Sequence, residues 1–468
     1  MRTPTEVARE RFAGKRVVVV GLAREGLALV RFLSAAGADV TANDRASAEM
    51  LSESLAALGG LPVRLVLGDH PLELFLGADV LFVSPGVPLQ LGPLEEARRR
   101  GIPISSETQL LMELCRGRVV GITGSSGKTT TTALVGRMLR EGGLRVHVGG
   151  NIGVPLLESL DDIGPADWVV LEMSSFQLEA LPYSPPVAAV LNVTPNHLDR
   201  HGDMDGYLAA KANIVRHQRP EDWAILNADD ERAAGLETRG RTIWFSIERP
   251  VDGSHLEGDR IVVRRGGAVQ PVCEVEAVRL RGRHNLANVV AATAVASAVG
   301  VAPDAMRVAI GGFRGVPHRL EVLGEVGGVT YCNDSIATAP ERSIASLNSF
   351  SEPIVLIAGG RGKRLPLEEW ARAIRARVKA LVLMGESSDA IERAVLDAPG
   401  DALPRMSRAG SMEEAVRLAH AAAEPGDVVL LAPGCTSFDM YRDFEERGER
   451  FRRCVRDLGG QLAGEVLP

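Results

Sequence analysis

Short apolar runs alternate with stretches of helical periodicity along most of the chain. Runs at residues 16–20, 119–122 and 168–173 have the length and β-branched content of buried strands. Amphipathic segments such as 129–140 lie between such runs. Because parallel strands need a long crossover that is usually a helix, this alternation predicts an α/β fold with parallel sheets.

The alternation falls into three blocks, and a length of 468 residues is also typical of about three domains. The first block opens with the strand–turn–helix–strand pattern of a nucleotide-binding fold at 16–41. The second includes a weaker β-like stretch at 241–280, and a Gly- and Pro-containing linker at 312–319 leads into the third. We expect domains at residues 1–110, 111–315 and 316–468.

Composition and charge exclude several classes of protein. The formal net charge is −7, which argues against a nucleic-acid-binding protein that relies on positive charge. The N-terminus has no apolar signal segment, and the longest mildly apolar run, 286–302, is too short to span a membrane and predicts a buried helix. Five widely spaced Cys residues without a CxxC motif indicate neither a zinc site nor a disulfide framework, so we expect a cytoplasmic protein.

The strongest chemical signal is a phosphate loop, Gly124-Ser125-Ser126-Gly127-Lys128-Thr129, which follows a strand and begins a helix. Backbone N–H groups and the helix N-terminus can cradle phosphate oxygens there. Lys128 can reach the β- and γ-phosphates, and Thr129 or Thr130 can ligate Mg²⁺. The strict motif would place glycine at 122, where this chain has Ile122, so the match is partial and a Gly-rich surface turn is the alternative. A P-loop kinase or other NTPase, which would need no amino-acid pocket, stays open as a second function.

The turn at residues 21–26 lacks the middle glycine of the dinucleotide-binding fingerprint. Asp44 follows at a position where an acidic residue can meet a ribose. A uridine nucleotide and NAD are therefore equally plausible ligands of the first block, and the second would imply an oxidoreductase.

Three further residues lie near the expected position of the phosphate loop. Glu172 ends one strand and His197 follows another, so both should lie at the ligand-binding edge of the sheet and can hold a Mg²⁺ ion. Each alone is better explained as a capping glutamate or a hydrogen-bonded histidine, and only their combination near a phosphate loop favours the metal. Lys211 lies in the helical segment GYLAAKANIV. It is either a solvated lysine or a partly buried one with a lowered pKa, whose amine can form a carbamate with CO₂.

Polar loops follow several strands of the third block. They mix cations with hydroxyl groups, as an anionic substrate requires. They are Val316-Pro317-His318-Arg319, Cys332-Asn333-Asp334-Ser335-Ile336-Ala337-Thr338, Gly359-Gly360-Arg361-Gly362-Lys363 and Pro433-Gly434-Cys435-Thr436-Ser437-Phe438-Asp439. Each stretch taken alone is better explained as an ordinary polar loop between a strand and a helix.

Taken together, these residues resemble the Mur ligases of peptidoglycan synthesis, and specifically the glutamate-adding branch. The resemblance covers nearly the whole chain. It rests on the ordered motifs GITGSSGKTT, GGNIGVPLLE, LEMSSFQLE, NVTPNHLDRHG, GRHNLANV, PHRLE, NDSIAT and SFDMYRDFEERG.

The resemblance implies a Rossmann-like UDP-binding domain, a central P-loop ATPase-type domain and a C-terminal Rossmann-like domain. It also implies an ADP-forming ligation of D-glutamate to UDP-N-acetylmuramoyl-L-alanine through an acyl phosphate. The substrates would be these two compounds and ATP, the cofactor Mg²⁺ at two sites, and the protein a monomer. Residues from two domains would converge, so domain closure would exclude water.

Site residues follow from the resemblance position by position. Gly124 to Thr130, Asn285, Asn288, Arg319 and Asp334 would bind ATP; Thr129, Glu172, His197 and carbamylated Lys211 would hold Mg²⁺; and Lys128, His197, Lys211 and His318 would act in catalysis. Substrate contacts would come from Asp44, Arg45, Ser84, Gly86 and Asn151 for the UDP-muramoyl substrate, and from Thr338, Lys363, Ser437 and Phe444 for glutamate.

The chain departs from the family pattern in two places. The phosphate loop reads SSG where TNG is common, which is a mild change because backbone atoms do most of the binding. Ile336 stands where the family often has a lysine that meets the glutamate side-chain carboxylate. Arg361, Lys363 or Arg364 can compensate, but the departure leaves L-glutamate open as an alternative substrate.

Overall fold

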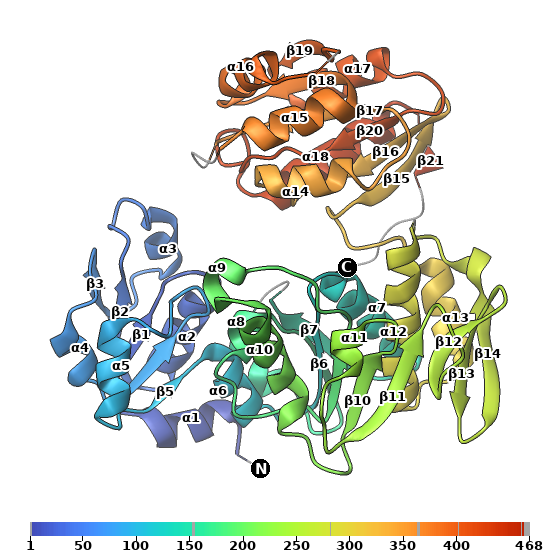
Figure 1. Ribbon diagram of the computed structural model, residues 1–468. Coiled ribbons are helices and arrows are strands. Elements are labelled where there is room, and N and C mark those ends of the chain that lie inside the picture. Colours follow the sequence, from blue (N-terminus) through green and yellow to red (C-terminus); the bar gives the residue numbers. More distant parts are fainter. Residues whose placement is uncertain are drawn as a thin grey trace. The chain divides into compact units, whose positions relative to one another are not determined.

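The computed structural model describes residues 2–151, 155–280, 282–362, 366–400, 402–459 and 461–462, without the side chains of residues 199, 461 and 462. The chain divides into two compact units, Met1–Gly312 and Phe313–Pro468. Three sheets carry the fold, two in the first unit and one in the second (Figure 1). The expected α/β architecture is confirmed.

The first sheet has the strand order β3-β2-β1-β4-β5 and is entirely parallel. This is the order of a nucleotide-binding half, with β1 at the centre. Its strands are β1 (Arg16–Val20), β2 (Asp39–Asp44), β3 (Arg64–Leu67), β4 (Val80–Val83) and β5 (Ile104–Ser105). Its helices are α1 (Pro4–Phe12), α2 (Arg24–Ala35), α3 (Ser52–Ala57), α4 (Leu72–Leu76), α5 (Gly92–Arg99) and α6 (Glu107–Leu114).

The second sheet has nine strands in the order β14-β13-β12-β11-β10-β9-β6-β8-β7. The weaker β-like stretch forms β11 to β14, of which β12 to β14 pair antiparallel. The strands are β6 (Arg118–Thr123), β7 (Val146–Gly150), β8 (Trp168–Glu172), β9 (Val187–Val190), β10 (Trp223–Asn227), β11 (Arg241–Ser246), β12 (Gly253–Glu257), β13 (Arg260–Arg265) and β14 (Ala268–Glu274). The α-helices are α7 (Lys128–Glu141), α8 (Ser175–Leu178), α9 (Leu198–His201), α10 (Met204–Arg216), α11 (Glu231–Ala234), α12 (Arg283–Val299) and α13 (Pro303–Gly312).

One continuous apolar core joins these two sheets. Val17 and Val19 of β1 belong to the same buried cluster as Leu171 of β8 and Ile214 of α10. The alternate residues of β1, such as Val18, face a separate cluster on the other side of the first sheet. The shared core explains why residues 1–312 form one unit even though they contain two sheets. The buried helix expected at 286–302 is α12, which packs against α7 and β11.

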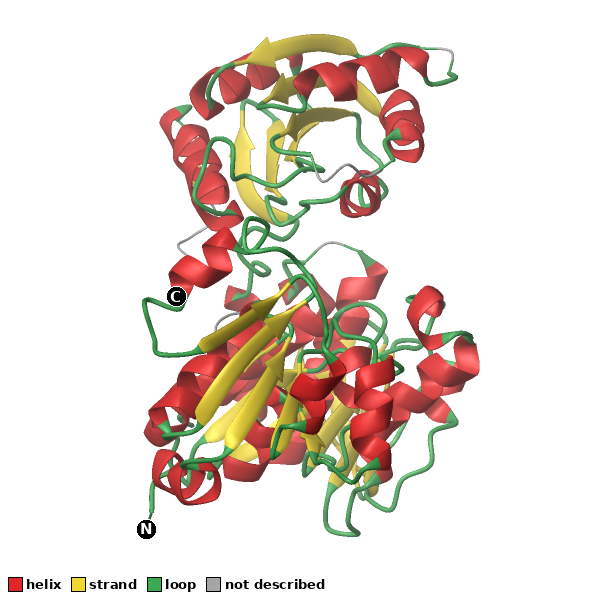
Figure 2. Ribbon diagram, turned by 90° about the vertical axis from the view of Figure 1, so that its left-hand side faces the viewer, coloured by secondary structure: helices red, strands yellow, loops and turns green. Residues whose placement is uncertain are grey.

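The second unit is a seven-stranded sheet in the order β19-β18-β17-β20-β16-β15-β21, with helices on both faces (Figure 2). Leu356 and Ala358 of β17 face one buried cluster, and Val355 and Ile357 face the other, as period-two alternation requires. Its strands are β15 (Glu321–Val326), β16 (Val329–Asn333), β17 (Ile354–Gly359), β18 (Val378–Met384), β19 (Arg405–Ala409), β20 (Val428–Leu431) and β21 (Gln461–Leu462). Its helices are α14 (Pro340–Leu347), α15 (Glu368–Arg377), α16 (Ser388–Asp397), α17 (Met412–Ala422) and α18 (Phe444–Asp457).

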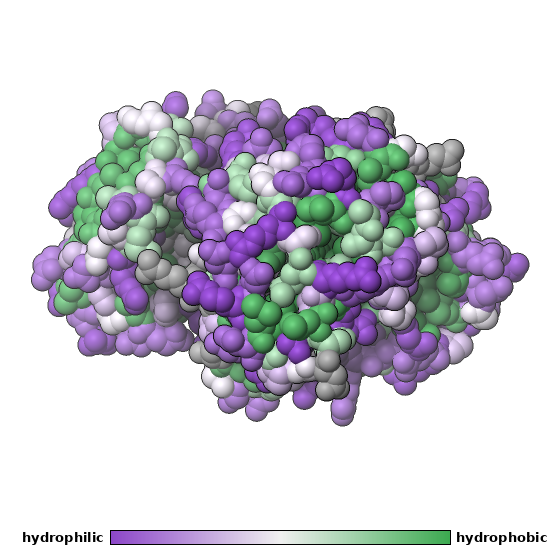
Figure 3. Space-filling view, turned by 90° about the horizontal axis from the view of Figure 1, so that it is seen from above, coloured by the Kyte–Doolittle hydropathy of each residue, from purple (hydrophilic) through white to green (hydrophobic). Residues whose placement is uncertain are grey.

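The face of the molecule drawn in Figure 3 is mostly hydrophilic, with apolar side chains in smaller areas between polar ones. Within the described residues, no helix has both the length and the apolar character needed to cross a membrane.

Candidate functional site

The phosphate loop connects β6 to α7, as the sequence predicts. Gly127 has φ of 79°, and a Cβ there would lie 2.1 Å from Oδ1 of Asn288, so only glycine fits. The same packing brings Asn288 of α12 beside the loop, although the two residues are far apart in sequence. Asn192 holds the loop from the other side, accepting from the N–H of Ser126 at 2.9 Å and donating to its carbonyl at 3.2 Å.

Two lysine side chains meet at one carbonyl oxygen of this loop. Lys128 Nζ donates to the carbonyl of Gly124 at 2.8 Å, and Lys211 Nζ donates to the same oxygen at 2.9 Å. Lys211 is only 1% exposed and lies 4.7 Å from the ring centre of Tyr207. Burial, and then the charge of Lys128, lower the pKa of Lys211 to about 7. Lys211 is therefore not a solvated surface lysine.

Glu172 ends β8 directly beside Ile122 of β6 and is almost fully buried. Its Oε1 accepts from Asn151 Nδ2 at 2.9 Å, whereas its Oε2 is buried without a hydrogen-bond partner among the described residues. An orphaned carboxylate oxygen near a phosphate loop fits a Mg²⁺ ion. Thr129, also buried, is the second residue of α7 and follows Lys128 directly.

Among the described residues, no group of three or more His, Cys, Asp or Glu side chains is arranged to hold a metal. A cation beside Glu172 would therefore also need hydroxyl groups, water or phosphate oxygens as ligands.

His197 lies at the start of α9 in a left-handed backbone conformation, with φ of 53°. Such a conformation costs energy for a non-glycine residue and is concentrated at functional sites. The ring of Phe176 lies 4.9 Å from the His197 ring, and His201 stacks on Phe176 at 5.4 Å. His201 also lies 5.3 Å from Tyr207, which links this aromatic cluster to Lys211.

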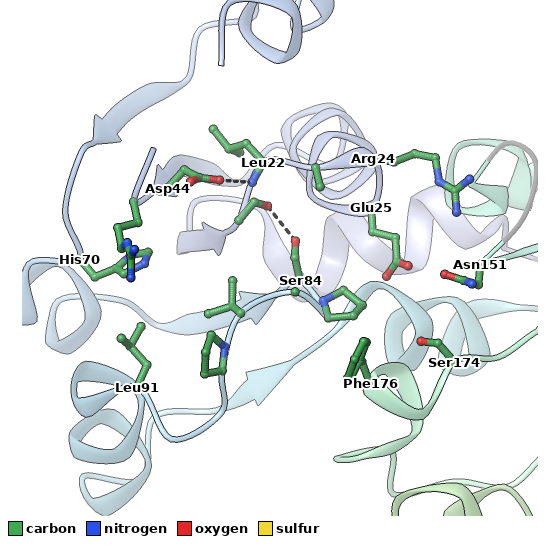
Figure 4. Close-up of a pocket in the computed structure, with 17 residues that line it drawn as sticks. Leu22, Arg24, Glu25, Asp44, His70, Ser84, Leu91, Asn151, Ser174 and Phe176 are labelled. Atoms are coloured by element: carbon green, nitrogen blue, oxygen red, sulfur yellow. Dashed lines mark hydrogen bonds between the residues drawn. The ribbon is translucent and has the colours of Figure 1, made fainter. Parts of the chain in front are cut away.

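A cavity of about 600 Å³ opens between the first sheet and α8 (Figure 4). Its lining includes five residues expected from the sequence to bind the UDP-muramoyl substrate, namely Asp44, Arg45, Ser84, Gly86 and Asn151. The structure thus brings Asn151 together with residues that lie between about 65 and 107 positions earlier in the chain.

Hydrogen bonds hold the walls of this cavity (Figure 4). Asp44 accepts from the backbone N–H groups of Leu22 and Ala46, each at 2.8 Å, and Ser84 Oγ donates to the carbonyl of Gly21 at 2.7 Å. Asp44 therefore shapes the turn after β1 in addition to facing the cavity.

Arg200 connects the middle segment to the loop that follows β4. It donates to the carbonyls of Val87 at 2.8 Å and Pro85 at 3.4 Å, and its guanidinium lies 5.4 Å from the ring centre of Phe176. The loop that carries Ser84 and Gly86 is thus held by the helix that begins beside His197.

Two buried carboxyl groups interact with each other, and one of them, Glu25, lines the cavity. Burial raises the pKa of Glu25 to about 7, and burial together with repulsion from Glu25 raises the pKa of Glu107 to about 8. Glu25 accepts from Gln177 Nε2 at 2.8 Å, and Gln177 also caps α8 through Ser174. In Figure 4 the Glu25 side chain extends toward Asn151 and Ser174.

The second unit has its own cluster of candidate residues around His318, which is buried and has φ of 62°. Asn333 Nδ2 lies 3.0 Å from His318 Nδ1, and Glu321 accepts from the His318 N–H at 2.9 Å. Burial lowers the pKa of His318. Gly448 of α18 packs against the ring, since a Cβ there would lie 2.1 Å from Nδ1.

Asp334 is buried at the end of β16, and burial raises its pKa. It accepts from the N–H of Leu320 at 2.9 Å and from Ser346 Oγ. Arg319, in contrast, is exposed. Ile336 is half-buried and donates its N–H to the carbonyl of His318 at 3.1 Å, so the residue that departs from the family pattern lies next to this cluster.

The residues expected at the glutamate pocket come from three segments of the second unit. Thr338 follows β16, Ser437 follows β20 and is buried, and Phe444 begins α18. The rings of Phe444 and His318 lie 6.3 Å apart. Lys363 lies outside the described residues.

Sequence reasoning did not single out several residues that the structure places in these sites. Arg200, Phe176 and Tyr207 lie within or near quoted motifs, but their roles depend on contacts between distant segments. Glu25 and Glu107 carry no local signal, since an acidic residue early in a helix is ordinary.

Comparisons with known proteins give a consistent result along the chain. Family models described as Mur ligase MurD-like, N-terminal domain; Mur ligase middle domain; and Mur ligase, glutamate ligase domain match residues 15–106, 122–296 and 318–435.

Two relatives are similar over nearly their whole length. The UDP-N-acetylmuramoylalanine--D-glutamate ligase of Symbiobacterium thermophilum is 46% identical over 449 residues, which cover 95% of this chain and 98% of that protein. The enzyme of the same name from Pelotomaculum thermopropionicum is 43% identical over 451 residues, covering 96% and 98%. The solved structure of UDP-N-acetylmuramate-alanine ligase MurC from Thermotoga maritima has a TM-score of 0.55 at 19% identity, covers 95% of this chain and 99% of that one, and supports the fold alone.

The buried carboxyl pair predicts how stability depends on pH. The folded protein keeps a proton on Glu107 up to about pH 8, whereas an unfolded glutamate releases it near its ordinary pKa of about 4.3. The folded state thus binds more protons between these values, so wild-type stability falls as pH rises. Glu107→Gln should remove part of this fall, and urea unfolding at pH 5 and pH 8 measures it. The exposed Glu95→Gln is the control, and an equal pH dependence in Glu107→Gln and wild type would contradict the assignment.

Proposed function

Because the chain belongs to the Mur ligase family, we propose that it joins D-glutamate to UDP-N-acetylmuramoyl-L-alanine with release of ADP and phosphate. The observation that carries the proposal is the phosphate loop beside the orphaned oxygen of Glu172 and the buried amine of Lys211. A P-loop kinase has no need of an amino-acid pocket, and the match of the second unit to a glutamate ligase domain favours the ligase.

The reaction takes place in two steps. A carboxylate oxygen of the alanyl group attacks the γ-phosphorus of ATP, the bond to the β-phosphate oxygen breaks, and ADP leaves. The amine of glutamate then attacks the acyl phosphate carbon. The tetrahedral intermediate loses a proton and expels phosphate as the amide forms.

Cationic and hydrogen-bonding groups of this chain would offset the repulsion between the alanyl carboxylate and the γ-phosphate of ATP. Gly124 to Thr130 would cradle ATP, and Lys128 would leave the Gly124 carbonyl to meet the γ-phosphate. Asn285 and Asn288 would contact ATP from α12, and Arg319 and Asp334 would do so from the second unit. His318, kept neutral by burial at neutral pH, would orient the reacting groups and accept a proton.

Magnesium would be held by Thr129 and Glu172 at one site, and by His197 and a modified Lys211 at a second. When bound, Mg²⁺ neutralises charge that develops on the transferring phosphoryl group. The orphaned oxygen of Glu172 supports the first site.

A carbamate on Lys211 is part of the proposal. Carbamate formation joins the neutral amine nitrogen to CO₂ with loss of a proton. A pKa of about 7 leaves a large fraction of the amine neutral at physiological pH. The product is an oxygen anion next to Lys128, where two lysine side chains otherwise donate to one carbonyl.

The UDP-muramoyl substrate would lie in the 600 Å³ cavity, with Asp44, Arg45, Ser84 and Gly86 toward the nucleotide and Asn151 toward the muramoyl end. Glutamate would bind through Thr338, Lys363, Ser437 and Phe444. The proposal includes action as a monomer in the cytoplasm, without nucleic-acid or membrane partners.

The first test is product formation with each enantiomer of glutamate offered separately. Multiple-turnover ADP release should require both UDP-N-acetylmuramoyl-L-alanine and D-glutamate, and mass spectrometry should show a new amide product. Product with L-glutamate alone would replace the proposed substrate with its enantiomer. Continuous ADP release in the absence of any amino acid, beyond the one ADP per enzyme that the first step yields, would contradict the ligase.

Lys128→Ala should lower the rate of ADP release by about 100-fold or more, because a charged group that stabilises the transferring phosphoryl group is lost. The measurement is a coupled ADP assay at saturating ATP. Near-normal turnover would remove Lys128 from the phosphate-binding role.

Lys211→Ala should be inactive and regain part of its activity with a short carboxylic acid such as acetate, which replaces the carbamate. The exposed Lys15→Ala should behave as wild type with or without acetate. Full activity of Lys211→Ala without acetate would show that no carbamate is needed.

A further inference from the structure

Arg447 is a charged residue whose side chain the proposed mechanism does not use. It lies in the first turn of α18, three residues after Phe444, and only 1% of it is exposed. Burying a guanidinium costs several kcal/mol unless its donors are satisfied. Its position therefore needs an explanation.

The guanidinium satisfies its donors almost entirely on backbone carbonyls. Nε donates to Ser335 Oγ at 3.0 Å, and Nη2 donates to the Ser335 carbonyl at 2.9 Å. Both terminal nitrogens donate to the Cys435 carbonyl at 3.2 Å, and Nη1 also donates to the Thr436 carbonyl at 3.2 Å. The planar fork of arginine can bridge several acceptors in this way, whereas a lysine ammonium cannot.

These acceptors belong to two separate loops. One loop follows β16 and continues to Thr338, and the other follows β20 and continues to Ser437. The strands β16 and β20 are hydrogen-bonded neighbours, so both loops leave the same edge of the sheet. Ser335 Oγ also donates to the carbonyl of Phe444 at 2.7 Å. Arg447 thus ties together the three segments that carry Thr338, Ser437 and Phe444.

The charge of Arg447 has no carboxylate partner within ion-pair distance among the described residues. Burial lowers its pKa to about 10, so the guanidinium stays charged at neutral pH. Cys435, Asp439 and Tyr441 are the neighbouring acidic groups that oppose this lowering of the pKa, and the Asp439 carboxylate accepts from the N–H of Glu386 at 2.9 Å. The guanidinium therefore places a positive charge against Ser335, next to Ile336, which supplies no cation.

We propose that Arg447 is a positioning residue for the amino-acid substrate: it holds the loops after β16 and β20 against the start of α18, and its buried charge favours binding of a dicarboxylate there. The inference rests on the proposed function, because it assumes that Thr338, Ser437 and Phe444 face glutamate.

Arg447→Lys and Arg447→Gln test the proposal. Loss of hydrogen bonds to a charged group should raise the KM for glutamate at least about tenfold in Arg447→Lys, and more in Arg447→Gln, which also loses the charge. The KM for ATP and for the UDP-muramoyl substrate should change less than about threefold. The exposed Arg453→Gln, on the same helix, should keep wild-type constants.

A purely structural role would give a different pattern. It would lower the melting temperature and the active fraction, and hence kcat, and leave the KM for glutamate unchanged. Ser335→Ala removes the acceptor of Nε and the bond to Phe444 without burying an unpaired charge, so it serves if the Arg447 variants do not fold. It should raise the KM for glutamate about threefold or more.

An unchanged KM for glutamate in folded Arg447→Lys and Arg447→Gln, or in Ser335→Ala if those do not fold, would overturn the proposal. The wild-type assay separates this outcome from failure of the proposed function, because a wild-type protein without glutamate-dependent ADP release would fail before any variant was compared.

Discussion

Backbone carbonyl oxygens hold the buried cations of both units. Lys211 is bound by the carbonyl of Gly124, and Arg447 by carbonyls of two loops. A carbonyl accepts a hydrogen bond from a cation and leaves the charge in place, whereas a carboxylate accepts the bond and also neutralises the charge. The candidate sites therefore keep positive potential for anionic substrates, and the positions of the surrounding loops depend on these hydrogen bonds.

Burying a cation costs several kcal/mol unless its donors are hydrogen-bonded, and the fold supplies the acceptors. Each cation is buried at the end of a parallel strand, where the strand ends and the following turns expose several carbonyls. Lys211 shows the limit of the arrangement, since burial and then the nearby charge of Lys128 lower its pKa to about 7. A lysine amine with a pKa of about 7 is partly neutral at physiological pH and can react with CO₂, whereas an exposed lysine stays protonated.

Much of the fold was predictable because its signals are local. The strand at 16–20, the phosphate loop and the buried helix at 286–302 follow from periodicity and turn residues, and the structure contains them as β1, the loop before α7, and α12. The helix α2 begins at Arg24, inside the turn expected at 21–26, because the tight turn after β1 needs only three residues. Burial of Lys211 could not be settled from the sequence, since its cause is packing against Tyr207 and the phosphate loop.

The remaining site features depend on contacts between distant segments. Arg447 satisfies its donors on residues about 11 and 112 positions away in sequence. Glu25 and Gln177 meet across 152 positions, and only the shared core of the first unit brings them together. A periodicity analysis detects neither kind of contact, because each residue is unremarkable among its own neighbours.

The absence of a side chain at Gly448 makes α18 less stable but leaves room for the imidazole of His318. Glycine inside a helix weakens it by about 0.5–1 kcal/mol relative to alanine, yet the imidazole of His318 occupies the space that a methyl group would fill. Engineering for heat resistance by the usual glycine-to-alanine route would therefore displace the imidazole here. The helix is therefore less rigid at Gly448, and the His318 ring packs directly against its backbone.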